Sequence, residues 1–303
     1  MILIMISTMA GCINDNEHVD IYVSVYPIEY IVQNIVDEDI VVKSVFPRGQ
    51  DIHDYDPSPK EIINMANCQL LFYIGSGLET FIENAKTTTL KDVEVYALSD
   101  YLNGFEDTKL VENNSYVTDD VHENAHMIDC QVWLDPIRMI KMSEFIYQKL
   151  CEKYPEKTDV FYQNYNKLIT SLNQLHQEYD QYLSQVSITK KYIMIDHDAY
   201  QYWTQRYGLY RIKLRNDNES SEVEIVEFDK KVELANKIGI KYILSTLNEA
   251  KCSMFNNYLR ALDAEERSLH HLANISKQEE KRNEDYISLM MYNLNILIEV
   301  LPK

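Results

Sequence analysis

The stretch from residue 47 to residue 59 reads Pro47-Arg48-Gly49-Gln50-Asp51-Ile52-His53-Asp54-Tyr55-Asp56-Pro57-Ser58-Pro59. It places the imidazole of His53 among three carboxylates in a turn bounded by prolines. An apolar run at 41–46 precedes the stretch, and Ser58 followed by Pro59 indicates a helix N-cap with proline at the first helical position. The loop is therefore predicted at the carboxyl end of a strand, where open α/β sheets bind ligands. Taken alone, one histidine in a polar loop is more often solvated than a ligand.

Strand-like and helix-like segments alternate on both sides of this loop. Apolar, often β-branched runs predict strands at 20–26, 41–46, 70–74, 93–98, 129–135, 191–195, 241–244 and 269–275. Runs with helical spacing lie between them, for example at 28–36, 136–154 and 285–301. This alternation predicts an α/β fold in which central, mainly parallel sheets are flanked by helices. With 303 residues, the chain is long enough for two such lobes.

One helix is predicted to be much longer than the others. After residue 155, apolar positions step alternately by four and three residues along one helical face. They are Phe161, Tyr165, Leu168, Leu172, Leu175, Tyr179, Tyr182 and Val186. A coiled-coil dimer is the competing interpretation, but the stripe is short and half aromatic, so packing along the chain's own lobes is favoured. We therefore expect a monomer.

The charge balance excludes one class of partner. The chain has 48 acidic and 29 basic residues, a formal net charge of -19, which repels nucleic acid. We therefore expect no nucleic-acid partner. Between 103 and 127 the periodicity fades and the composition becomes acidic and polar, which predicts a mobile loop. Its two histidines, His122 and His126, are expected to be solvated more often than bound to metal.

The first twelve residues form an apolar run that ends in small residues and Cys12. This pattern resembles the lipobox of an exported lipoprotein, in which the cysteine carries a lipid anchor, so 1–12 is predicted to be a signal peptide. No lysine or arginine precedes the run, which leaves an upstream start codon or a buried first strand as alternatives. The remaining cysteines contain no Cys-x-x-Cys pair, which excludes a zinc knuckle and leaves both disulfides and free thiols open.

Four ordered motifs give the chain a family resemblance. They are the 47–59 stretch, Val-Trp-Leu-Asp-Pro at 132–136, His-Asp-Ala-Tyr at 197–200 with Tyr-Gly-Leu at 207–209, and the 286–294 segment. Their order and spacing resemble the zinc and manganese solute-binding proteins of ABC importers. The resemblance implies an N-terminal lobe at 13–155, a linking helix at 156–186, a C-terminal lobe at 187–303 and a metal ion between the lobes. Such extracytoplasmic receptors deliver the ion to an ABC permease in the membrane.

The resemblance also implies a ligand set for this chain. His53 matches the first family ligand and His197 the third, and histidine at the third position resembles zinc receptors more than manganese receptors. Gln131 stands where the family has its second histidine, and Ala273 stands where it has an acidic ligand. An amide is a poorer zinc donor than an imidazole, and alanine donates nothing. A Zn²⁺ site of His53, His197 and Gln131, which could be weak or take Mn²⁺ or another divalent ion, is therefore predicted.

Water or a nearby residue could complete the coordination at the weakened positions. The candidate residues are Cys130, His270, His271, Asn274 and a residue of the 103–127 loop. If 129–135 is a strand, Cys130 points away from the side that Gln131 faces. If 269–275 is a strand, His270 and His271 point to opposite faces. We expect one of these histidines in the core and the other on the surface.

Two other functions compete with metal transport. A metal-dependent hydrolase is the least favoured, because the chain has no His-Glu-x-x-His helix and no Gly-x-Ser-x-Gly motif. The main alternative is a family member that has lost tight metal binding and acts as a surface interaction or adhesion protein, or binds another ligand. The residues that favour it are Gln131 and Ala273.

Overall fold

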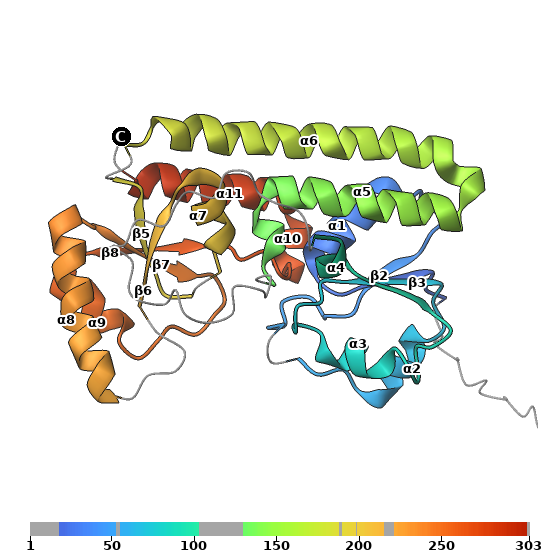
Figure 1. The fold of residues 1–303 in the computed structure, drawn as a ribbon, viewed down its shortest axis with the longest axis horizontal. Coiled ribbons are helices and arrows are strands. Elements are labelled where there is room, and N and C mark those ends of the chain that lie inside the picture. The colour runs from blue at the N-terminus through green and yellow to red at the C-terminus, as the bar shows by residue number, and fades with distance from the viewer. Residues whose placement is uncertain are drawn as a thin grey trace, which may run out of the picture.

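The computed structural model of the protein describes residues 18–52, 55–102, 130–187, 190–197, 199–214 and 221–301. Cys12, His53 and the 103–127 segment with His122 and His126 lie outside these ranges. Two lobes, each built on one sheet, lie beneath a single long helix (Figure 1). The predicted fold class, two parallel-sheet α/β lobes joined by a long helix, is confirmed.

The N-terminal lobe has a four-stranded parallel sheet in the order β2-β1-β3-β4. Its elements are β1 (Ile21–Val23), α1 (Tyr26–Ile35), β2 (Val42–Ser44), α2 (Pro59–Met65), β3 (Leu70–Tyr73), α3 (Thr80–Ala85), β4 (Glu94–Ala97) and α4 (Leu98–Leu102). Alternate residues of β3 enter different clusters, Leu70 and Phe72 on one face and Leu71 and Tyr73 on the other. Helices therefore cover both faces of the sheet, as an all-parallel sheet requires.

The C-terminal lobe repeats this plan with the strand order β6-β5-β7-β8, again all parallel. Its elements are β5 (Tyr192–Ile195), α7 (Gln201–Tyr207), β6 (Tyr210–Lys213), α8 (Ser221–Ile238), β7 (Tyr242–Thr246), α9 (Phe255–Leu262), β8 (Glu265–Leu269), α10 (Lys277–Lys281) and α11 (Tyr286–Val300). Gly208 ends α7 in the left-handed conformation, with φ of 71°. In both sheets the chain reverses its direction of winding between the two central strands.

The long helix α6 (Thr158–Gln185) runs across both lobes (Figure 1). It contacts α1 and α5 (Pro136–Lys153) above the N-terminal sheet and α7 and α11 above the C-terminal sheet. Most of the predicted apolar stripe is buried, including Phe161, Leu172 and Tyr179. The domain boundaries at 12, 155 and 186 stay predictions.

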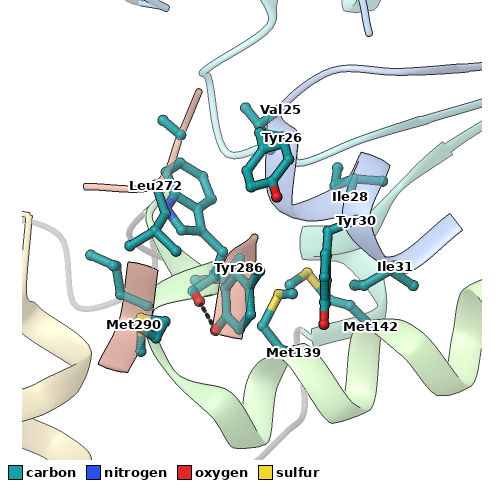
Figure 2. Packing of buried hydrophobic residues seen from close by; sticks show 14 of the residues in the cluster. Val25, Tyr26, Ile28, Tyr30, Ile31, Met139, Met142, Leu272, Tyr286 and Met290 are labelled. Atoms are coloured by element: carbon teal, nitrogen blue, oxygen red, sulfur yellow. Dashed lines mark hydrogen bonds between the residues drawn. The ribbon is translucent and has the colours of Figure 1, made fainter. Parts of the chain in front are cut away.

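The two lobes share one hydrophobic core. A single cluster of buried side chains contains members of β1, α1, α5, α6, α7 and α11. At its centre Tyr30 of α1 lies beside Tyr286 of α11, with ring centroids 5.4 Å apart, and Met139 and Leu272 pack nearby (Figure 2). Separate, smaller clusters lie under α2 and α3 and under α8 and α9. The apolar contact between the lobes is thus continuous with the interior of each.

Two predicted strands are wrong, and both errors affect the site. Val132–Leu134 forms a 3-10 turn, η2, rather than a strand, because Asp135 caps α5 immediately afterwards by accepting a hydrogen bond from the backbone N–H of Ile137. Residues 270–275 form a loop, in which Leu272 has φ of 60°, and the last strand β8 lies earlier. The strand at 210–213 and β8 were missed because charged residues interrupt their apolar patterns.

Two further features of the described residues concern the cysteines and the possibility of a membrane-spanning helix. The cysteines Cys68, Cys130, Cys151 and Cys252 form no disulfide with one another. In the described part of the chain, every helix is too short or too polar to cross a membrane.

Candidate metal centre

The candidate site lies at the carboxyl edge of the C-terminal sheet, where the central strands β5 and β7 adjoin. The loop after β5 carries His197, and the turn after β7 carries Glu249. Open parallel sheets bind ligands at this point, because the connections leave to opposite faces and open a crevice. The backbone N–H of Cys252 donates to the carboxylate of Asp196 at 3.1 Å, which holds the two loops together.

Two of the predicted ligands, far apart in sequence, meet here. The side-chain amide of Gln131 lies with its Nε2 3.1 Å from Nε2 of His197. Gln131 is 6% exposed and directly precedes η2. The indole N–H of Trp203 donates to the carbonyl of Leu134 at 2.8 Å, and the Arg206 guanidinium donates to Asp135 at 2.7 Å. Gln131 is therefore fixed to the C-terminal lobe next to His197, although it stands before α5 in the chain.

Glu249 lies between two imidazoles. Its Oε2 accepts from Nδ1 of His197 at 3.0 Å, and its Oε1 lies 3.6 Å from Nε2 of His271. The backbone N–H of Ala273 donates to Nδ1 of His271 at 3.1 Å, so a neutral His271 ring carries its proton on Nε2, toward the carboxylate. Burial lowers the pKa of His271 to about 4, despite the opposing effect of Glu249, so this ring is neutral at pH 7.

The 270–276 segment connects this site to the loop that carries His53. Asn274 donates from Nδ2 to the carbonyls of Pro47 at 2.6 Å and Gln50 at 2.9 Å, and the backbone N–H of Gly49 donates to the Ile275 carbonyl. Asp51 lies near enough to His271 to raise the pKa of that ring. The described part of the 47–59 stretch, up to Ile52, therefore lies against the same edge of the C-terminal lobe.

The residues near the two weakened ligand positions lie mostly in the interior. Ala273 is fully buried, and its carbonyl accepts from the backbone N–H of Tyr26 at 3.0 Å, so its side chain supplies no donor. His270 is the predicted core histidine, 3% exposed. The prediction that its neighbour is a surface histidine is wrong, because His271 is partly buried beside Glu249. The two rings do not diverge as in a strand but stack, 5.8 Å apart. Cys130 does not lie in a strand either, because only the 3-10 turn η2 follows it.

Glu249 was not found from the sequence. It stands alone in a polar turn, outside every motif, and a single glutamate there is usually solvated. The available signal was positional, because a carboxylate five residues after a predicted strand shares an edge with His197 when the two strands are neighbours.

The described residues supply only part of a metal site. Within the described ranges, no group of three or more His, Cys, Asp or Glu side chains is arranged to hold a metal ion. They contribute the imidazole of His197 and the amide of Gln131, and His53 lies outside them. Zinc accepts the imidazole nitrogen that His197 offers, whereas the Gln131 amide is a poorer zinc donor, so these two residues fit only part of a zinc site.

Comparison with known proteins identifies the family. The sequence model of the ZnuA family, described as zinc-uptake complex component A, periplasmic, matches residues 21–300. The chain belongs to this family. ZnuA proteins are components of a zinc-uptake complex, which is a transport role.

Individual members of the family support the same assignment. The zinc-binding protein AdcA of Streptococcus pyogenes serotype M3 is 28% identical over 296 residues, which cover 92% of this chain and 55% of AdcA. The high-affinity zinc uptake system protein ZnuA of Bacillus subtilis is 22% identical, covering 96% of this chain and 90% of that protein. The crystal structure of Zn(II)-bound AdcA from Streptococcus pneumoniae has a TM-score of 0.73 at 25% identity, covering 95% of this chain and 58% of that chain. The chain thus spans little more than half of its AdcA relatives.

One carboxylate near the site gives a pH-dependent prediction. A hydrogen bond from His270, at 3.4 Å, and others from Ser276 hold the pKa of Glu279 at about 2. Because the pKa of Glu279 is lower in the folded state than its unfolded value of 4.5, the ionised carboxylate stabilises the fold above about pH 4.5. This contribution to stability is lost as the pH falls toward 2. We expect Glu279→Gln to lower the unfolding free energy by about 3 kcal/mol at pH 7 and by roughly half as much at pH 3.

Urea unfolding at both pH values measures this difference. Glu265→Gln, which changes a carboxylate that is 69% exposed, is the matched control and should change the unfolding free energy by less than about 0.5 kcal/mol at either pH. An equal destabilisation by Glu279→Gln at pH 7 and pH 3 would contradict the expected linkage.

Proposed function

We propose that the protein is an extracytoplasmic receptor that captures one Zn²⁺ between its two lobes and delivers it to an ABC permease. The observation that carries this proposal is the contact between Gln131 and His197, 3.1 Å apart at the switch point of the C-terminal sheet. Two residues predicted as ligands from separate motifs meet there, in a chain of the zinc-uptake family.

The proposed ligands are His53, His197 and the amide oxygen of Gln131. Two imidazoles and one amide form a neutral donor set, so charge compensation for Zn²⁺ must come from neighbouring carboxylates. Glu249, 3.0 Å from His197, and Asp51, near His271, are the described carboxylates at this edge. Manganese prefers carboxylate and carbonyl oxygen, and a site with two imidazoles favours zinc over manganese.

The location and partner follow from the same proposal. Cys12 carries the lipid that anchors the receptor to the outside of the membrane, after removal of the preceding residues, and residues 13–155 and 187–303 form the two lobes on either side of the 156–186 helix. The receptor works as a monomer, because its ligands come from one chain. An outward-facing anchor keeps the receptor close to the permease that accepts the ion.

Zinc titration tests this function. The chain without residues 1–12, which retains every described residue, is stripped of metal with a chelator and titrated with Zn²⁺ by calorimetry, with native mass spectrometry to count the ions. We expect one ion per chain. A chain that takes up no zinc would favour the alternative in which this family member has lost metal binding and recognises another ligand or surface.

A single substitution measures how far Gln131 weakens the site. Gln131→His should bind zinc more tightly, because an imidazole at this buried position replaces an amide with a better zinc donor. Gln131→Leu, which has similar volume and no donor, is the matched control and should bind more weakly than the wild type. Equal affinities for all three chains would place Gln131 outside the zinc site.

A further inference from the structure

We propose that Glu249 is the positioning residue that makes His197 competent to bind zinc, by fixing the tautomer and orientation of its ring. The inference rests on the proposed function and deepens it. It concerns a carboxylate that lies outside the four motifs and acts through His197 rather than on the ion.

The hydrogen bonds of His197 define its tautomer. A carboxylate only accepts hydrogen bonds, so the 3.0 Å contact between Nδ1 and Oε2 of Glu249 requires a proton on Nδ1. The Gln131 amide nitrogen lies 3.1 Å from Nε2, and because an amide nitrogen only donates, a lone pair on Nε2 satisfies this contact. Both contacts are satisfied by one neutral ring, with Nδ1 protonated and Nε2 available as an acceptor.

This tautomer is the one that a zinc ligand needs. The Nε2 lone pair of His197 points toward Gln131, the other proposed ligand of the described region. To act as a ligand, Gln131 would have to present its amide oxygen rather than its N–H group to the ion, while Glu249 would keep the His197 ring in its orientation. Carboxylate–histidine–metal arrangements of this kind raise the basicity of the ligand nitrogen.

The position of Glu249 is itself fixed by its surroundings. Its second oxygen faces the protonated Nε2 of His271, and the His271 backbone carbonyl accepts from the indole N–H of Trp133 at 2.7 Å. The Glu249 side chain is only 15% exposed. A carboxylate held between two imidazoles in a partly buried place also offsets the charge of a bound cation. This charge matters because Ala273 stands where the family resemblance implies an acidic ligand.

Two measurements on the wild type and on variants of Glu249 test the inference. The first is zinc affinity of metal-stripped protein: Glu249→Ala should raise the Kd about 10- to 100-fold, and Glu249→Gln, which keeps an acceptor for Nδ1–H, should raise it less. Glu233→Ala, which removes an exposed carboxylate from α8, is the charge-matched control and should leave the Kd unchanged.

The second measurement needs no metal. Nitrogen-15 NMR of the histidine rings should show His197 of the metal-free wild type with its proton on Nδ1, and a mixture of tautomers in Glu249→Ala. Wild type in the Nε2–H form, or Glu249→Ala with the wild-type Kd, would overturn the inference. If wild type itself binds no zinc, the proposed function fails first, and the inference about zinc fails with it.

Discussion

Replacing His197 with alanine is expected to raise the Kd for zinc about 100-fold or more, and His53→Ala should have an effect of the same order. Apparent zinc-binding free energies of about 10–16 kcal/mol, shared over the three proposed protein ligands, correspond to about 3–5 kcal/mol per ligand, and each 1.4 kcal/mol is about tenfold in affinity. In addition, His197 is held by Glu249 and Gln131, so its loss leaves both polar groups without their partner. Competition with a chromogenic chelator measures the change.

Another histidine serves as the control for this pair. His18, whose side chain is 71% exposed, lies near the start of β1 and pairs with Asp20, so His18→Ala should bind zinc like the wild type. If His53→Ala and His197→Ala also keep wild-type affinity, zinc binds elsewhere or not specifically, and the assignment of the site is wrong.

Asp135→Ala is expected to have the largest effect on stability. The carboxylate is 1% exposed and accepts from the Arg206 guanidinium at 2.7 Å, with Arg138 at 3.6 Å. Removing one partner from a buried ion pair typically costs about 3–5 kcal/mol, because the remaining charge stays buried. Asp135 also caps α5, and loss of a cap adds about 1 kcal/mol. The midpoint of guanidinium unfolding reports this change.

Asp135→Asn separates the two contributions. It keeps a side-chain acceptor for the cap and a similar volume but loses the charge, so its destabilisation should lie between wild type and Asp135→Ala. Glu152→Ala, which removes a carboxylate that is 62% exposed and paired with Lys149, should cost less than about 1 kcal/mol. If Asp135→Ala lowered the free energy of unfolding by less than about 1 kcal/mol, the prediction would be wrong, and Arg138 and Arg206 would have to find other partners or become solvated.

Periodicity was sufficient to predict much of the fold. The alternating segments predicted two parallel sheets, and the stripe from Phe161 to Val186 predicted α6, because burial on one helical face leaves a direct mark in the sequence. The strand β8 was missed because its residues, such as Glu265 and Arg267, are charged and partly exposed at the edge of a sheet. Trp133 was assigned to a strand because full burial in a short turn gives the same apolar pattern as a buried strand.

The site was only partly predictable for a different reason. His53, Gln131 and His197 stand in motifs, so local sequence was enough to predict them as ligands. Glu249 and His271 act through distances across the fold, which depend on which strands adjoin and on the loop at 270–275. No local pattern records such a contact, and the incorrect strand at 269–275 led us to place His270 and His271 on opposite faces.

The shared core of the two lobes has a consequence for how an ion leaves. Hinged receptors open because their lobes touch mainly through polar, wetted surfaces. Here separation of the lobes would expose side chains such as Leu272, Met139 and Tyr286 to water (Figure 2). At roughly 1.5–3 kcal/mol for each large apolar side chain, three of them would cost about 5–9 kcal/mol. Under the proposed function, we therefore expect the ion to leave through local rearrangement of the loops at the site, such as rotation of the Gln131 amide, rather than through separation of the lobes.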